Sequence, residues 1–330
     1  GMGGSILGAE ALYCFLKKKI RKKVYFFNDL DQNKIDNFKK KEILSSVLFI
    51  IISKSGNTVE TLSNTFLLKI IKKNAKNVII ISEKKDNLLF NLSKKLNLFY
   101  IEHKNYIGGR YSVLSEVGIV PAYLMGVNVF KLRSQILNYL KGANKKILKD
   151  SSIKLSEILI SKKKNNLILL NYSPELDKLL YWCQQLIAES LGKKNMGFLP
   201  VISTAPKDHH SLLQLYLDGP KDKIFYIFSS EIKSKIKIKV SKFIDKKNIL
   251  NNKLLSSVKN AQKNALIKTL KKKGVSYREF KLKKIEEKSL GKFFSYFILE
   301  TIFIGRLSNI NPFNQPAVEQ VKKYTKLLLN

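Results

Sequence analysis

The chain has 330 residues, enough for two domains with a substantial core. Its 61 Lys and Arg residues outnumber 25 Asp and Glu residues, which gives a formal net charge of +36. No zinc-finger, RNP or arginine-rich signature accompanies this diffuse charge. We therefore attribute the charge to a compositional bias towards lysine and not to nucleic-acid binding. The two cysteines form no Cys-x-x-Cys pair, which argues against a zinc site and favours a reducing cytoplasm. No apolar run reaches the roughly 18 residues of a membrane span.

Short apolar runs rich in β-branched residues alternate with longer amphipathic runs along the first half of the chain. This alternation is typical of βα units around a parallel sheet. We expect strands near residues 24–28, 47–52, 78–82 and 98–101, with helices between them. A helical stretch follows from Gly126 to about Lys141, and then a lysine-rich passage.

The same pattern restarts in the second half. Strands are expected near residues 167–171, 224–228 and 275–280, and long helices near residues 174–190, 254–273 and 286–304, with a terminal helix after Pro316. We therefore predict an α/β protein with two doubly wound, mainly parallel sheets. Residues 1–128 form the predicted first domain, and residues 129–330 form the second domain with a C-terminal helix.

One loop has the composition of a phosphate site. The apolar run 47–52 leads into Ser53-Lys54-Ser55-Gly56-Asn57-Thr58, just before a helix that carries Glu60. Hydroxyl groups and free N–H groups at a helix amino terminus suit a phosphate dianion. An ordinary helix cap also uses Ser or Thr, but it does not require three hydroxyls and a glycine. The glycine-rich start of the chain, residues 1–5, is a weaker signal of the same kind.

An arginine stands out in Gly108-Gly109-Arg110-Tyr111-Ser112, because the chain has only five arginines among its 61 basic residues. A planar guanidinium donates to carboxylate, phosphate or a developing oxyanion in a fixed geometry, and glycines allow close backbone approach. The alternative is a surface arginine beside a tight turn. The pentapeptide alone does not decide between them.

Six motifs together carry a resemblance to a known family. They span residues 3–8, 53–61, 108–118, 184–193, 208–211 and 314–322, and their order along the chain is similar to that of glucose-6-phosphate isomerases. The resemblance implies two flavodoxin-like sugar isomerase (SIS) domains. It also implies the reversible aldose-ketose isomerisation of glucose 6-phosphate and fructose 6-phosphate in glycolysis and gluconeogenesis. The reaction uses ring opening and a cis-enediol proton shuttle, with no metal or other cofactor.

The resemblance also implies a role for each motif residue. Glu189 moves the proton between sugar C1 and C2, Arg110 steadies the enediolate, and His210 opens the ring with Lys322 as its partner. The phosphate is held by Ser5, Ser53, Lys54, Ser55 and Thr58, and the sugar pocket is lined by Gly4, Glu60, Gln185 and Gln315. The neighbouring subunit supplies the histidine, so a homodimer with a shared active site is implied.

The chemistry of the residues fits these roles but leaves alternatives open. A partly buried carboxylate on one face of the enediol can shuttle the proton, and an arginine supplies a cation that does not deprotonate. Glu189 could equally be a helix-surface carboxylate, since most Glu residues are exposed. His209 is as good a ring-opening candidate as His210, and Lys323 is as good as Lys322.

The start of the chain departs from the family pattern. Family members normally carry a segment before the glycine-serine loop that includes the strand leading into it. We therefore expect the first sheet to lack a central strand, and this chain to fold less stably than one extended upstream. The competing functions are a bifunctional phosphoglucose/phosphomannose isomerase, against which Gln315 argues, and a noncatalytic SIS-domain sugar-phosphate binder.

Overall fold

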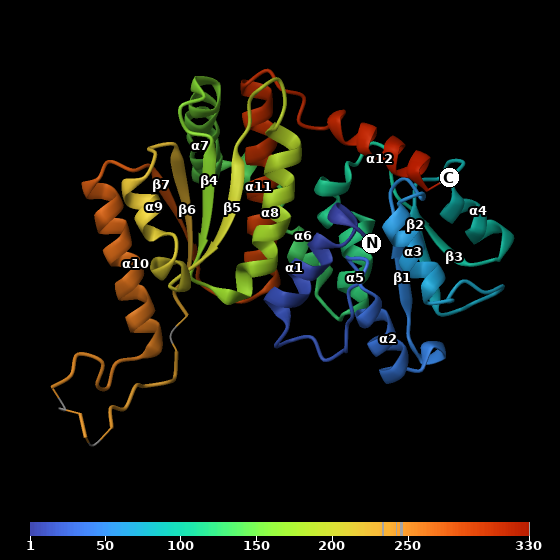
Figure 1. The fold of residues 1–330 in the computed structure, drawn as a ribbon, viewed down its shortest axis with the longest axis horizontal. Helices are drawn as coiled ribbons and strands as arrows, with labels where there is room; N and C mark the ends of the chain where they lie inside the picture. Colours follow the sequence, from blue (N-terminus) through green and yellow to red (C-terminus); the bar gives the residue numbers. More distant parts are fainter. Residues whose placement is uncertain (233, 242, 245–246, 330) are drawn as a thin grey trace.

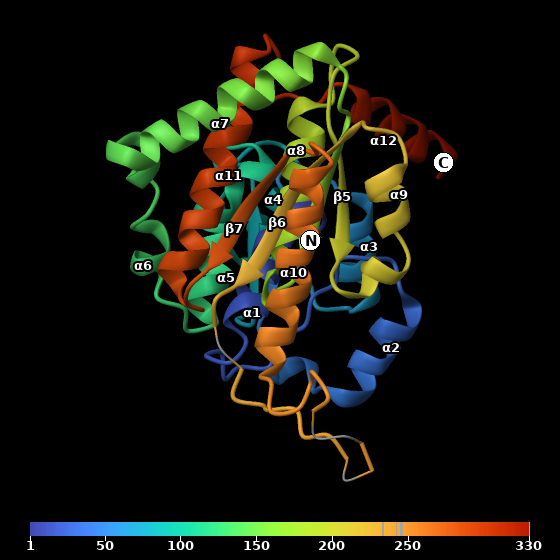
Figure 2. The ribbon, with the colours of Figure 1, turned by 90° about the vertical axis from the view of Figure 1, so that its left-hand side faces the viewer.

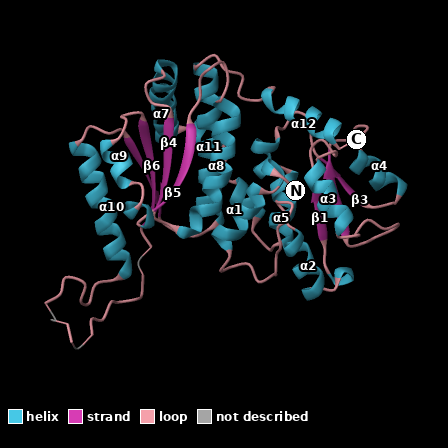
Figure 3. Cartoon of the chain, viewed as in Figure 1, coloured by secondary structure: helices cyan, strands magenta, loops and turns pink. Residues whose placement is uncertain are grey.

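The computed structural model describes residues 1–232, 234–241, 243–244 and 247–329. Two parallel sheets lie at opposite sides of the molecule, with a layer of helices between them (Figure 1). None of the helices in these described ranges is both long and apolar enough to cross a membrane. Figure 3 shows the same two sheets as separate groups of strands.

The first sheet contains β1 (Phe49–Ile52), β2 (Val78–Ser82) and β3 (Phe99–Glu102), in that order and all parallel. The apolar runs of β1 and β2 are largely buried, as expected for strands within a parallel sheet, whereas β3 lies at the sheet edge and Phe99 is exposed. On one face, α2 (Gln32–Lys41) and α4 (Leu88–Lys95) pack on Phe49, Ile51 and Ile80. On the other, Val117 of α5 (Glu116–Leu124) packs on Ile52 and Ile81. The helix α3 (Val59–Leu67) follows β1, which confirms the predicted helix that carries Glu60.

The strand predicted at residues 24–28 is wrong. Tyr25 and Phe27 pack their rings on Phe38, but the segment belongs to no sheet. Gly1 lies between this segment and the end of β1. Its amino group donates to Phe27 O (3.1 Å), and a Cβ built on it would lie 3.1 Å from Ile52 O. At this end of β1, Gly1 and not residues 24–28 is the backbone neighbour of Ile52.

The second sheet contains β4 (Asn166–Asn171), β5 (Leu199–Thr204), β6 (Lys223–Ser230) and β7 (Tyr277–Leu282), in the order β5-β4-β6-β7 and all parallel. The strand β4 has later strands on both sides, so the winding direction reverses beside it. The strand β5, which contains Pro200, was not predicted from the sequence. A proline is tolerated there because β5 lies at the sheet edge.

Helices cover both faces of the second sheet, which confirms the doubly wound prediction (Figure 2). On one face, α9 (Leu213–Asp218) and α10 (Leu255–Lys272) bury Ile168, Leu170 and Phe225. On the other, α7 (Gly142–Ser161), α8 (Asp177–Leu191) and α11 (Glu287–Leu307) cover Leu167 and Leu169. Alternate residues of β4 thus point to opposite helix layers, as the pleat requires. The terminal helix is α12 (Ala317–Leu328).

Two helix predictions need correction. The stretch predicted from Gly126 to Lys141 is broken into α6 (Val129–Arg133) and a short 3-10 turn at Asn138–Leu140. The lysine-rich passage that follows is the helix α7. Its buried Leu148, Leu155 and Leu159 recur at helical spacing, and its lysines face outward, so the charge had masked an amphipathic pattern.

The helices between the sheets share one core. Leu12 and Phe15 of α1 (Leu7–Leu16) belong to the same buried cluster as Trp182 and Leu186 of α8 and Phe294 of α11. The rings of Trp182 and Phe294 meet edge-on, 4.9 Å apart. Segments from both halves of the chain therefore pack together, and the division at residue 128 stays a prediction.

Candidate active site

Arg110 lies at the centre of the predicted site, in the 3-10 helix η3 (Gly109–Leu114) that follows β3, and is only 3% exposed. Its guanidinium donates five hydrogen bonds, to Ser190 Oγ (2.7 Å), Glu189 Oε2 (3.3 Å), Gln315 Oε1 (3.0 Å), Pro312 O (2.5 Å) and Asn314 O (3.1 Å). A guanidinium has five N–H groups, so its donor capacity is fully used. The arginine therefore joins the first sheet's loop to α8 and to the chain before α12.

Glu189 lies in the last turn of α8 with its side chain 31% exposed. One carboxylate oxygen accepts from Gln185 Nε2 (2.9 Å), and the other accepts from Arg110 Nη1 (3.3 Å). Gln185 and Glu189 are four residues apart and so share one helix face. This geometry orients the carboxylate and keeps it accessible, as a proton shuttle requires.

Two glycines allow the start of the chain to dock on this cluster. A Cβ built on Gly4 would lie 2.2 Å from Gly109 O, so no larger residue fits there. Gly3 has a φ of +51°, and a Cβ on it would lie 2.6 Å from Gln185 Nε2. The close backbone approach expected beside Arg110 is thus made by η1 (Gly3–Ser5). A Cβ on Gly1 would lie 3.2 Å from Ser5 Cβ and 3.1 Å from Ile52 O, so Ser5 lies near the end of β1.

The predicted phosphate loop follows β1. Ser53 is buried and shares a hydrogen bond with Thr58 (Oγ to Oγ1, 2.8 Å), and Thr58 is the N-cap residue of α3. The hydroxyl of Ser55 accepts from Asn57 N (3.3 Å), and the residue is exposed. Glu60 lies beside the loop in the first turn of α3. The four residues sit around one helix amino terminus.

The side chain of Lys54 has protein partners. Its ammonium donates to Asn105 O and Ile107 O (2.9 Å each) and lies 3.4 Å from Glu83 Oε1. It therefore ties the phosphate loop to the segment that leads to Arg110. The backbone N–H is the group that Lys54 has left to offer an anion.

The structure distinguishes the two neighbouring histidines. Both lie in η6 (Lys207–His210), which follows β5. His209 is half-buried, and its Nε2 shares a hydrogen bond with Tyr172 OH (2.7 Å); burial lowers the pKa of its imidazole. His210 is exposed. The internal partner of His209 leaves His210 as the histidine presented to solvent.

His210 and Glu189 lie at opposite ends of α8. The amino end of α8 is beside the end of β4, where Asn171 Nδ2 donates to Asp177 Oδ1 (2.6 Å). Ala205, just before η6, donates to Asn171 O (2.8 Å), so His210 belongs to this end. Glu189 is twelve residues further along α8, or about 18 Å at 1.5 Å per residue.

Lys322 lies on α12, which begins two residues after Gln315. Its ammonium pairs with Glu319 (2.7 Å), and both side chains are exposed. The structure thus gathers Arg110, Glu189, Gln185, Gln315 and Gly4, and it leaves Lys322 and His210 outside that cluster.

Sequence reasoning missed two residues of the cluster. Ser190 is fully buried and accepts from Arg110 Nε, and Tyr111 OH lies 2.8 Å from the same hydroxyl and donates to Pro312 O (3.0 Å). Burial raises the pKa of Tyr111. Both residues adjoin predicted catalytic residues in sequence, which is the only signal that could have pointed to them.

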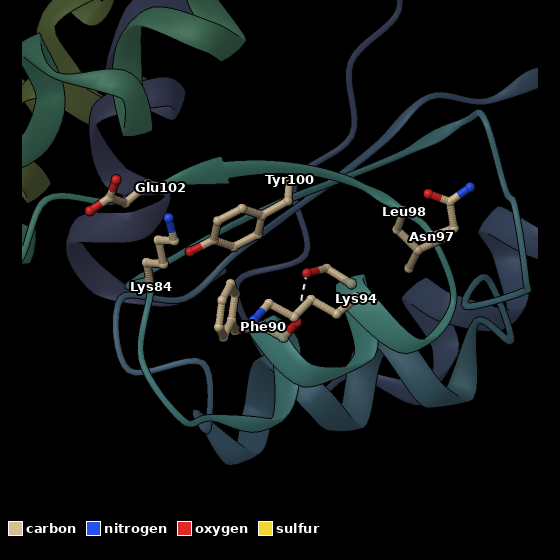
Figure 4. Close-up of a pocket in the computed structure, with 8 residues that line it drawn as sticks. Lys84, Phe90, Lys94, Asn97, Leu98, Tyr100 and Glu102 are labelled. Atoms are coloured by element: carbon tan, nitrogen blue, oxygen red, sulfur yellow. Dashed lines mark hydrogen bonds between the residues drawn. The ribbon is translucent and has the colours of Figure 1, made fainter.

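A separate hollow of about 500 Å³ lies beside β3 and α4 (Figure 4). The rings of Phe90 and Tyr100 meet there, 5.1 Å apart, and the ammonium of Lys94 lies 4.3 Å from the Phe90 ring centre. None of the predicted site residues lines it. Its polar lining comes from Lys84, Ser93, Lys94, Asn97 and Glu102, none of which was predicted for the site, so the hollow forms no part of the candidate site.

The fold and the cluster define a class: a doubly wound α/β protein of the sugar-phosphate isomerase type, with a hydroxyl-rich helix amino terminus and an oriented carboxylate. Residues 1–330 match the family described as phosphoglucose isomerase. The chain belongs to the phosphoglucose isomerase family. This confirms the resemblance recognised in its motifs.

Individual relatives agree with the family. The glucose-6-phosphate isomerase of Methanocaldococcus jannaschii is 34% identical over 339 residues, covering 98% of this chain and 81% of that protein. A hypothetical protein from Thermus thermophilus has the same fold, with a TM-score of 0.89 and 24% identity over 100% of this chain and 82% of the other. A glucose-6-phosphate isomerase from Chlamydia trachomatis has a TM-score of 0.81 and 16% identity, covering 100% and 68%. The family and its relatives indicate glucose-6-phosphate isomerase activity, which confirms the predicted enzyme class.

Proposed function

We propose that this chain interconverts glucose 6-phosphate and fructose 6-phosphate, with Glu189 moving the proton between C1 and C2. The observation that carries the assignment is the pair of contacts that orients its carboxylate, from Gln185 Nε2 (2.9 Å) and Arg110 Nη1 (3.3 Å). An oriented, partly exposed carboxylate beside a permanent cation is what enediolate chemistry needs.

The phosphate group binds at the amino end of α3. Ser5, Ser53, Ser55 and Thr58 supply hydroxyls, and Lys54 supplies its backbone N–H, because its ammonium already has partners. The helix dipole of α3 adds a favourable field for the dianion. Gly4, Glu60, Gln185 and Gln315 line the sugar between this end and Glu189.

Arg110 acts on the enediolate through Nη1. The Nε and Nη2 atoms donate to Ser190 and to main-chain carbonyls, which hold the loop, whereas Nη1 donates to the side chains of Glu189 and Gln315. A substrate oxygen takes the place of Glu189 at Nη1. The exchange places the cation on the developing oxyanion and releases Glu189 Oε2 as the base.

Ring opening requires a second copy of the chain. His210 is exposed at the carboxyl end of the second sheet, beside the strand where the winding direction reverses, which is where doubly wound sheets bind ligands. The amino end of α8, on the side where His210 lies, is about 18 Å along the helix from Glu189 of the same chain. A homodimer that brings His210 of one protomer to the Glu189 cluster of its partner, together with Lys322, completes the site. We place this enzyme in the cytoplasm, consistent with its two unpaired cysteines.

The proposal is tested by a coupled assay of fructose 6-phosphate isomerisation on the wild type and on Glu189→Gln. The amide keeps the size of the side chain but cannot accept the proton, so activity falls by about 10²- to 10⁴-fold. Glu157→Gln, on the exposed face of α7, is the matched control and keeps full activity. Unchanged activity in Glu189→Gln refutes the assignment, and turnover of mannose 6-phosphate by the wild type identifies the bifunctional enzyme instead.

A further inference from the structure

The loop between α11 and α12, residues 308–316, is held by three cations through its main-chain carbonyls. Lys194 Nζ donates to Asn309 O (2.9 Å), and Lys193 Nζ donates to Asn311 O (2.6 Å). Arg110 Nη2 donates to the next carbonyls along, Pro312 O (2.5 Å) and Asn314 O (3.1 Å). We call residues 308–316 the connecting loop. It carries Gln315 and leads directly into α12, which carries Lys322.

The two lysines come from a tight turn immediately after α8, residues 193–196, here called the lysine turn. The main-chain N–H groups of Lys193 and Met196 each donate to the carbonyl of the other (2.9 Å). The central residues Lys194 and Asn195 have left-handed φ values of 52° and 55°. Such turns favour Asn and Gly, and a lysine is unfavourable there. Backbone strain of this kind persists only where contacts with the surrounding structure stabilise it.

The charged groups near the lysine turn are consistent with Lys193 fixing the connecting loop. Burial, and then the nearby Arg110 cation, lower the pKa of Lys193 to about 8, and the Glu189 carboxylate opposes the shift. The ammonium also donates to Ser190 O (3.1 Å), in the last turn of α8. Lys193 therefore joins the segment that carries Glu189 to the loop that carries Gln315.

We propose that the lysine turn is a positioning element of the active site, in which Lys193 and Lys194 fix the connecting loop and so place Gln315 and α12 against the Glu189 cluster. The inference rests on the proposed isomerase function. It adds two positioning residues, Lys193 and Lys194, whose ammonium groups donate to main-chain carbonyls rather than to the substrate. Arg110 holds the end of the connecting loop, through Gln315 Oε1 and the carbonyls of Pro312 and Asn314, whereas the two lysines hold its beginning.

The test uses Lys193→Met, Lys193→Arg and Lys194→Gly in the full chain. Lys194→Gly removes the ammonium and also relieves the strain of the left-handed backbone. If Lys194 has no role in positioning the site, this variant has equal or higher thermal stability and unchanged kcat. Lys162→Gly is the matched control, because Lys162 has the same left-handed φ (56°) at the end of α7, is exposed and lies away from the site.

The expected result is a fall in kcat of about 10- to 100-fold for Lys193→Met and Lys194→Gly, with KM for fructose 6-phosphate within about threefold. Competitive inhibition by inorganic phosphate is unchanged, because the loop at residues 53–58 is intact. Hydrogen exchange in the peptide spanning residues 308–316 accelerates in both variants. Lys193→Arg restores most of the activity, and Lys162→Gly changes neither kcat nor loop exchange.

Three outcomes would contradict either the positioning proposal or the proposed function. Unchanged hydrogen exchange of the connecting loop in both variants overturns the positioning proposal, whether or not the enzyme is active. A folded wild-type chain without isomerase activity instead overturns the proposed function. Accelerated loop exchange with unchanged kcat also overturns the positioning proposal, since the loop would then be held without consequence for the chemistry.

Discussion

Arg110 Nε donates to Ser190 Oγ over 2.7 Å, although 80 residues separate the two in sequence, and both are buried. Their hydrogen bond fixes the loop after the first sheet to the last turn of α8. Since Glu189 adjoins Ser190, the position of the proposed catalytic carboxylate depends on an arginine that is supplied by the other half of the chain.

Arg110→Lys is expected to inactivate the enzyme although it preserves the charge. A lysine ammonium has three donors without the planar fork, so it cannot replace five hydrogen bonds. Loss of transition-state stabilisation lowers kcat about 10²- to 10³-fold, measured in the coupled assay. Arg133→Lys, at an exposed position of α6, is the control and retains activity. Wild-type kcat in Arg110→Lys would show that only the charge matters.

Ser190→Ala is expected to destabilise the fold as well as the site. The change leaves Arg110 Nε and the Tyr111 hydroxyl without their shared partner, and an unsatisfied buried polar group costs about 1 to 3 kcal/mol. Urea denaturation measures the loss.

Tyr111→Phe and the double variant complete a thermodynamic cycle with Ser190→Ala. The two side chains share one hydrogen bond, so the double variant is more stable than the sum of single effects predicts, by about 0.5 kcal/mol or more. Strictly additive effects would mean that the 2.8 Å contact between them has no energetic role.

The predictions that succeeded rested on strong local patterns. Continuous apolar runs identified β1, β2, β4 and β6, and the helix that carries Glu60 was predicted from the hydroxyl-rich loop before it. The strand at residues 24–28 failed for a different reason. Strand formation needs a hydrogen-bonded neighbour, and Gly1 occupies the space beside that segment, which local composition does not reveal.

The motifs predicted which residues belong to the candidate site, but they did not predict the long-range contacts between those residues. Arg110, Glu189 and Gln315 were named from motifs, but their mutual hydrogen bonds depend on how two sheets share a helix layer. The partnership of Lys54 with the carbonyls of Asn105 and Ile107 carries no sequence signal, because any lysine among many could make it.

Glu116→Gln is expected to loosen the ends of the segment that carries Arg110. The carboxyl of Glu116, at the start of α5, pairs with buried His103, which follows β3. Burial alone would raise the pKa of Glu116, but the hydrogen bond to His103 and those from backbone N–H groups together outweigh it, and the pKa lies below its ordinary value of 4.5. The pair therefore stabilises the fold above about pH 4.5, and this contribution is lost as the pH falls through the lowered pKa.

Urea denaturation at pH 7 and at pH 3 measures this contribution. At pH 7, Glu116→Gln is less stable than the wild type by about 1 to 3 kcal/mol, and the difference shrinks at pH 3. Glu102→Gln is the control, because its exposed pair with Lys104 contributes little at either pH. An equal difference at both pH values would contradict an ionised Glu116.

Arg278→Met is expected to be the most destabilising of these changes, because it removes the cation that pairs with the buried carboxylate of Glu300. Glu300 of α11 is buried and accepts from Arg278 Nη1 (3.0 Å), Tyr226 OH (3.0 Å), Tyr296 OH (2.5 Å) and Ser151. Burial raises its pKa, and the arginine opposes that shift. Removing one partner of a buried ion pair costs about 3 to 5 kcal/mol.

The pH dependence distinguishes this cause from a simple loss of packing. Without Arg278, the pKa of Glu300 rises further, and a group with a raised folded pKa contributes most stability below its unfolded value, 4.5, and loses it as the pH rises through the folded pKa. The deficit of Arg278→Met in urea denaturation is therefore larger at pH 8 than at pH 5. Arg278→Met combined with Glu300→Gln recovers part of the loss at pH 8, because no charge is then buried. A deficit that is independent of pH and unchanged by the second substitution would assign the effect to packing around α11.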